Sequence, residues 1–235
     1  MAVLKMRLAG PMQAWGASSR FVNRNTRQEP TKSGVLGLLA AAEGRRRSDP
    51  VEDLAQLRFG VRIDQPGRLL RDFQTARSLD GKESMPLSYR YYLVDAVFLA
   101  VVEGPRSLIE GLGKALTDPA YPLYLGRRSC VPSGDVKIGI SDEELDAALR
   151  SEPWLAASWY QKRQRSKNVS LEIVRDAVTM DEQKEGETVR DVPLSFSPEN
   201  RQYTWRTVVR PMPQVVVNMF GRDNEHDPMA ELGGA

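Results

Sequence analysis

The N-terminal stretch that decides the fold reads VLKMRL over residues 3–8, GPMQAWG over residues 10–16 and SGVLGLLAAAE over residues 33–43. The first segment alternates apolar and basic residues, which predicts a half-buried strand. The third predicts a helix that the chain enters through Thr31, Lys32 and Ser33. The first N–H groups of a helix have no partner within it, so they can bind an anion. We therefore expect an anion to bind where the loop over residues 10–16 meets the helix.

Positive charge is concentrated in the same stretch. Residues 1–47 contain nine Lys/Arg and two Asp/Glu, although the whole chain of 235 residues has a net charge of only +2. Residues 222–235 carry one Arg and four Asp/Glu. This uneven distribution indicates a local contact with a polyanion rather than general coating of DNA.

The bulk composition is that of an ordinary globular protein, with 41% hydrophobic and 27% charged residues. The single cysteine, Cys130, excludes an intramolecular disulfide, and no signal peptide is apparent, so a cytoplasmic location is expected. The longest apolar run, residues 36–42, is too short to span a bilayer, so we expect no membrane contact.

Further along the chain, the pattern predicts a hairpin, a long strand, a helix and another strand. The hairpin is expected from a strand over residues 58–64, a turn over 65–67 and a returning strand over 68–74. Residues 76–88 predict an exposed loop or the tip of a long hairpin, and residues 89–102 give the strongest strand signal, with the apolar half buried. A helix over 106–116 and a strand over 136–140 follow.

This order of elements is typical of a split β-α-β fold, as in ferredoxin-like and RRM-like domains, with one inserted hairpin. We therefore predict an α+β protein with an RRM-like palm over residues 1–148. Residues 149–235 are expected to form a β-rich C-terminal region packed on the palm and ending in an acidic tail. Strands are predicted there over residues 169–175, 203–210 and 215–220, after a short helix over 142–150.

The sequence lacks the residue patterns that most catalytic sites, metal sites and cofactor sites require. The loop over residues 10–16 has no Lys-Ser/Thr pair after its second glycine, so it is no phosphate-binding P-loop. No metal-ligand cluster can be assembled, and we expect no cofactor. The only histidine, His226, lies in the acidic tail, and Cys130 is better explained as a small buried side chain than as a nucleophile.

Three clusters combine basic and aromatic residues on predicted loops, which is typical of proteins that bind single-stranded RNA. Arg and Lys would neutralise phosphates, and aromatic faces would stack on unpaired bases. Each cluster could also be a solvated surface beside a core aromatic residue, and Trp15 could be purely a core anchor. The candidate RNA-binding residues are Gln13, Trp15, Arg24, Arg27, Lys32, Ser33, Arg77, Arg90, Tyr91, Arg127, Arg128 and Ser129.

Three segments also resemble a known family. RLAGPMQAWG over residues 7–16, TKSGVLGLL over residues 31–39 and YLGRRSC over residues 124–130 resemble the CasD family of type I-E CRISPR Cascade subunits, which belongs to the RAMP proteins. Weaker similarity extends through residues 91–96 and 190–193, so the resemblance covers essentially the whole chain.

The resemblance implies a non-catalytic subunit that caps the 5′ handle of the mature CRISPR RNA. It implies contacts with the backbone subunits along the guide and with the large subunit that inspects target DNA. It also implies a thumb-like hairpin that passes over the guide, for which the segment around residues 77–92 is the candidate.

Two alternatives stay open. Relatives in another subtype cleave repeat RNA without metal, using Tyr, Lys and His; here the sole histidine is in the acidic tail, which argues against a nuclease. The basic clusters could also meet acidic partner proteins in a pure scaffold.

Overall fold

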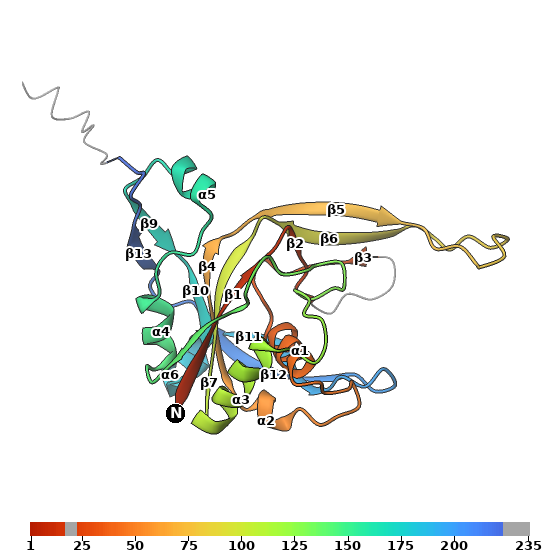
Figure 1. The fold of residues 1–235 in the computed structure, drawn as a ribbon, viewed down its shortest axis with the longest axis horizontal. Coiled ribbons are helices and arrows are strands. Elements are labelled where there is room, and N and C mark those ends of the chain that lie inside the picture. The colour runs from red at the N-terminus through yellow and green to blue at the C-terminus, as the bar shows by residue number, and fades with distance from the viewer. Residues whose placement is uncertain (17–22, 223–235) are drawn as a thin grey trace, which may run out of the picture.

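The computed structural model describes residues 1–16 and 23–222, and its centre is one large sheet (Figure 1). The sheet has seven strands in the order β11-β12-β10-β4-β7-β1-β8. Every neighbouring pair in it is antiparallel. The predicted α+β class is thereby confirmed. The strands are β1 Ala2–Ala9, β4 Arg58–Gln65, β7 Val97–Gly104, β8 Lys137–Ser141, β10 Ile173–Asp176, β11 Glu187–Ser195 and β12 Gln202–Val209.

Helices cover both faces of the sheet because the central strands are apolar on both sides. On β1, Leu4 and Met6 point into the main core, where Leu36 of helix α1 (Lys32–Ala42) also packs. Helix α3 (Arg106–Thr117) contributes to the same core, and the short helix α2 (Glu52–Ala55) leads into β4. Val3 points to the opposite face, into a second core with Leu149 of helix α4 (Leu145–Ser151). The helices predicted over 33–43, 106–116 and 142–150 are thus present.

A long hairpin projects from the sheet and determines the outline of the molecule (Figure 1). Its outer strands are β5 (Arg68–Gln74) and β6 (Ser88–Val94), which pair antiparallel from Arg68↔Val94 to Gln74↔Ser88. The inner strands β4 and β7 pair from Arg58↔Glu103 to Gln65↔Val97, with a one-residue register shift between Ile63 and Gln65. The predicted hairpin over residues 58–74 is therefore wrong, since β4 and β5 do not pair with each other. They form one arm, β6 and β7 form the other, and residues 75–87 form the tip.

A kink replaces the turn that was predicted over residues 65–67. Gly67 has φ +73, and a Cβ there would overlap the carbonyl oxygen of Val94. On the facing arm Asp95 has φ 58, and its carbonyl oxygen accepts a hydrogen bond from the side chain of Gln65. Both arms therefore bend at the same level, where the chain leaves the large sheet. The predicted strand over residues 89–102 bends at this kink, and its apolar half, β7, is buried as expected.

Two short strands of the N-terminal region complete the sheet at the hairpin. Strand β2 (Met12–Gln13) pairs with residues 93–94 of β6, and strand β3 (Asn23–Arg24) pairs in parallel with residues 89–90. The loop that was expected to bind an anion is thus joined to the base of the hairpin.

The C-terminal residues extend the large sheet and add a small module at its end. Strands β10, β11 and β12 belong to the large sheet, whereas β9 (Asn168–Leu171) and β13 (Gln214–Val217) form a separate two-stranded sheet. The strand predicted over 169–175 is therefore two strands in two sheets, divided at Glu172. Strand β11 and the helices α5 (Ser158–Arg163) and α6 (Met180–Glu185) were not predicted.

Candidate nucleic-acid interface

The loop over residues 10–16 is built into the core. The indole of Trp15 is fully buried, and its Nε1–H donates to Oε1 of Gln13 at 3.1 Å. The buried amide of Gln13 donates to the carbonyl oxygens of Leu8 at 3.1 Å and Ala96 at 2.7 Å. The burial supports the core-anchor interpretation of Trp15. Neither side chain offers an exposed surface to a base or a phosphate.

Protein groups already occupy the N-terminus of α1. Thr31 caps the helix, and its Oγ1 accepts the backbone N–H of Gly34 at 3.2 Å. The backbone N–H of Lys32 donates to Oδ2 of Asp191 at 2.8 Å. Its Nζ lies 3.2 Å from Oδ2 of Asp176, and burial lowers the pKa of Lys32 although Asp176 opposes that shift. The expected open helix terminus is corrected, because a carboxylate of β11 takes the place predicted for an external anion.

Arg127 links strands β3 and β6 near the base of the hairpin. Its guanidinium donates to the carbonyl oxygens of Tyr91 at 3.1 Å and Arg24 at 2.8 Å. It also lies over the ring of Tyr92, with 4.7 Å between Cζ and the ring centroid. The neighbouring Gly126 has φ +92, which a residue with a side chain rarely adopts. This loop is therefore held in a fixed position against β3 and β6.

Three further arginines lie near Arg127. Arg24 is the register partner of Arg90 in the parallel β3–β6 pair, so both side chains point to the same face of the small sheet as Tyr92. The side chain of Arg128, which follows Arg127 in the chain, is exposed. None of the three forms an ion pair with a carboxylate of residues 1–16 or 23–222. We call Arg24, Arg90, Arg127 and Arg128 the hairpin-base cluster.

The other predicted residues lie apart from this cluster. Arg77 forms an isolated bridge with Ser84 near the hairpin tip. The backbone N–H of Arg27 donates to the carbonyl oxygen of Trp15 at 2.8 Å. Ser33 lies in the first turn of α1, and Ser129 is exposed beside Cys130. Arg20 and His226 lie outside the described residues.

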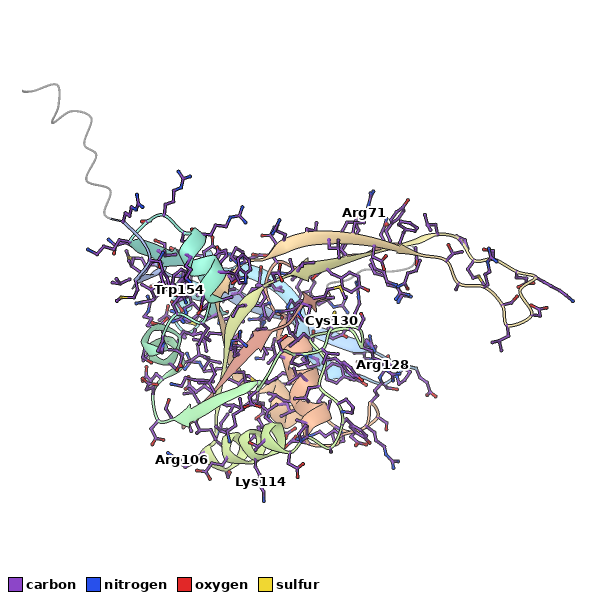
Figure 2. The ribbon with its side chains drawn as sticks, turned by 45° about the horizontal axis from the view of Figure 1, so that its top comes forward. Arg71, Arg106, Lys114, Arg128, Cys130 and Trp154 are labelled. Atoms are coloured by element: carbon purple, nitrogen blue, oxygen red, sulfur yellow. The ribbon has the colours of Figure 1, made fainter. Side chains whose placement is uncertain are left out.

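The sequence prediction included Tyr91 but missed Arg71 and Phe73, which lie beside it on the outward face of the hairpin. Arg71 and Phe73 of β5 are register partners of Tyr91 and Tyr89, so the four side chains share one face. The guanidinium of Arg71 lies 5.2 Å from the ring centroid of Tyr89, and Phe73 is 68% exposed. Figure 2 shows Arg71 and Arg128 on opposite sides of the hairpin. Tyr91 therefore faces away from the hairpin-base cluster.

The described part of the chain offers little catalytic chemistry. Cys130 is fully buried, and burial raises the pKa of its thiol, which keeps it protonated and unreactive. Within residues 1–16 and 23–222, no group of three His, Cys, Asp or Glu side chains could hold a metal ion. In the same residues no helix is long and apolar enough to cross a membrane.

Comparisons with known proteins test the family resemblance found in the sequence. Residues 3–209 match the family described as CRISPR-associated protein (Cas_Cas5). The chain belongs to this family.

Individual relatives narrow the resemblance. The chain is 36% identical over 173 residues to the CRISPR system Cascade subunit CasD of Escherichia coli (strain K12), covering 64% of this chain and 77% of the relative. It is similar to a solved structure described as a Cas protein, with TM-score 0.69, 38% identity and coverage of 95% and 100% of the two chains. It is also similar to a chain of a CRISPR RNA-guided surveillance complex, with TM-score 0.73, 29% identity and coverage of 98% and 97%. The resemblance found in the sequence is confirmed.

Proposed function

We propose that this protein is a non-catalytic subunit of a CRISPR Cascade surveillance complex that binds the 5′ handle of the CRISPR RNA. The similarity to CasD and to a chain of an RNA-guided surveillance complex supports membership of such a complex. The protein would work in antiviral defence in the cytoplasm, beside the backbone subunits and the large subunit.

The palm is proposed to be a ferredoxin-like palm of the RAMP type. Its central strands follow the order β4-β7-β1-β8, with α1 and α3 packed in one core on the same face. This is the spatial arrangement expected when a β-α-β-β-α-β chain forms one antiparallel sheet. The β5–β6 hairpin corresponds to the thumb and would pass over the guide.

The hairpin-base cluster is the observation that carries the proposal. Arg24, Arg90 and Arg128 lie around Arg127 and form no ion pair with a carboxylate of residues 1–16 or 23–222, so phosphate groups would satisfy their charge. Arg127 has a different role, because its donors are used on protein carbonyl groups. It would hold the other arginines in position rather than contact the RNA itself.

The decisive experiment compares two charge-matched variants of the full chain. Arg24→Gln/Arg128→Gln should weaken crosslinking to end-labelled RNA that carries the handle. It should flatten the salt dependence of binding by about 1.4 on a log–log plot, from about 0.7 for each phosphate contact with a single strand. Arg46→Gln/Arg47→Gln removes two charges elsewhere and should leave both measurements unchanged. If the salt dependence of binding is unchanged in the first variant, the hairpin-base cluster does not contact the RNA.

The same gel tests the competing nuclease function. An intact crosslinked RNA is expected, since cleavage needs a positioned group that titrates near neutrality and Cys130 is buried and protonated. A shorter labelled product formed without added metal would show that the protein is a nuclease. If the isolated subunit does not crosslink, the measurement is repeated on the assembled complex.

A further inference from the structure

A small module at the opposite end of the molecule from the hairpin tip has its own basic and aromatic surface. Helix α5, strand β9 and strand β13 form this end (Figure 1). Residues 158–171 and 214–222 contain five Lys/Arg and no Asp/Glu. We call these two segments the α5–β9–β13 module.

The module is held together by a buried amide. The side chain of Asn218, which is 1% exposed, donates to the carbonyl oxygens of Gln161 at 2.9 Å and Gln164 at 3.0 Å. Its Oδ1 accepts the backbone N–H of Phe220 at 3.0 Å. These bonds join the end of α5 to the segment after β13. The cations on both segments therefore have fixed relative positions.

Four cations converge where the two segments meet. Lys162 lies over the ring of Phe220, with 5.3 Å from Nζ to the ring centroid, and Arg163 follows it in the last turn of α5. The backbone N–H of Arg222 donates to the carbonyl oxygen of Arg165 at 2.9 Å. A Cβ on Gly221 would overlap the carbonyl oxygen of Ser166, so this close approach requires glycine.

These cations differ from several arginines of the protein that a carboxylate neutralises within the described residues. Elsewhere Arg45, Arg62, Arg175 and Arg206 form ion pairs at 2.7 Å or less. Lys162, Arg163, Arg165 and Arg222 form none with the part of the chain that the structure describes, and all four are exposed.

Aromatic rings are exposed on the same module. Trp159 and Phe220 are each 49% exposed. Trp159 packs edge-on against Tyr160, with 5.9 Å between the ring centroids, which fixes its orientation while one side stays open. Cations that form no ion pair within the described residues, next to half-exposed aromatic rings, suit a single strand whose phosphates and unstacked bases are both accessible.

We propose that the α5–β9–β13 module is a second nucleic-acid site, specific for single strands and separate from the hairpin-base cluster. Lys162, Arg163, Arg165 and Arg222 contact successive phosphates, and Trp159 stacks on a base. A duplex binds more weakly, because its bases are not available for stacking. The site goes beyond handle binding and does not depend on it.

The test uses the full-length protein and three fluorescein-labelled probes: oligo-dT, oligo-rU and a duplex of the same length. Replacing the four cations by Gln should weaken single-strand binding and lower its salt slope by about 2.8, from about 0.7 for each contact. Trp159→Ala should weaken binding fivefold or more, since one stacked base contributes about 1 kcal/mol or more. The ratio of the two single-strand affinities identifies DNA or RNA as the favoured partner.

The matched control replaces the exposed cations Arg46, Arg47, Lys114 and Lys184 by Gln, with melting curves recorded for every variant. All variants keep the acidic residues after Arg222, so these affect each comparison equally. Equal slopes for the two quadruple variants, or duplex binding as tight as single-strand binding, would overturn the proposal. So would module variants that bind the probes normally but fail to join the assembled complex, because the surface would then serve a protein partner. Normal handle crosslinking by the module variant would show that the two sites are independent.

Discussion

The most demanding prediction concerns a fully buried ion pair within strand β4, whose arginine also binds the segment at the end of helix α4. Arg62 of β4 and Asp64 are both inaccessible to solvent. The guanidinium donates to the Asp64 carboxylate at 2.7 and 2.9 Å. It also donates to the carbonyl oxygens of Leu149 at 2.8 Å, Glu152 at 2.7 Å and Pro153 at 2.8 Å. All five N–H groups of the side chain are therefore used.

The perturbation is Arg62→Met, which keeps most of the volume and removes every donor. It leaves a buried carboxylate and three carbonyl oxygens without this partner, so we expect a loss of about 3–5 kcal/mol in the free energy of unfolding. For a chain of this size that corresponds to a melting temperature lower by about 6–20 °C. Asp64 keeps one bond, because its Oδ2 still accepts the backbone N–H of Leu155 at 2.6 Å.

The assay is urea unfolding followed by tryptophan fluorescence. Trp154 reports on this region because its Nε1–H donates to the carbonyl oxygen of Asp64 at 2.9 Å. The control, Arg106→Met on α3, removes exposed ion pairs with Glu110 and Asp142 and should cost less than about 1 kcal/mol. Figure 2 shows Arg106 and Trp154 at separate edges of the molecule.

A double variant separates the ion pair from general packing damage. Arg62→Met/Asp64→Asn should cost about 1–3 kcal/mol less than the sum of the two single changes, since the second change removes the stranded charge. If Arg62→Met costs under about 1 kcal/mol, or if the two changes are additive, the buried Arg62 does not stabilise β4 and the segment after α4 as described.

Two further predictions concern the loop at residue 126 and the helix α6. Gly126→Ala should destabilise the protein by about 3 kcal/mol or more in thermal melts, because φ is +92 and a Cβ would also overlap the carbonyl oxygen of Ala14. Gly134→Ala, also at positive φ but with open space around it, should cost less; equal costs would refute the steric reason. The hydrogen bond from Arg175 lowers the pKa of Glu182 from 4.5 to about 2, so its contribution to stability is present above pH 4.5 and lost as the pH falls toward 2. Glu182→Gln should therefore reduce the loss of stability between these pH values in urea titrations, and an unchanged pH profile would show that the pair contributes nothing.

The long hairpin shows where local patterns suffice and where they fail. Alternation and apolar runs located β1, β7 and α1 because each is decided by residues within a few positions. The sequence Gln65-Pro66-Gly67 is typical of a turn, yet the arm continues through it in the same register. Only the pairing partner, more than twenty residues later, distinguishes a kink from a turn, and no local pattern contains that information.

The candidate site illustrates the same limit for side chains. The sequence places Lys32 at a helix N-terminus, which is a correct statement about local structure. Its backbone partner is Asp191, which is 159 positions away in the chain. A motif names the residue types that can bind an anion, but it does not tell whether that anion is a phosphate or a carboxylate of the same protein.

Hydrogen bonds from side chains to backbone carbonyl oxygens also hold the segments that carry the exposed cations. Arg127 donates to backbone carbonyl oxygens of β3 and β6. Asn218, which follows β13, donates to carbonyl oxygens at the end of α5. In both places a polar side chain fixes two segments, and neighbouring cations such as Arg24 and Arg165 form no ion pair with a carboxylate of the described residues. Ordering a long side chain costs conformational entropy, so a rigid backbone beneath it reduces what a ligand must supply. The two proposed surfaces therefore share one arrangement, in which a backbone fixed by internal hydrogen bonds carries the cations that would meet phosphate groups, and this fixed backbone lowers the entropy cost of binding.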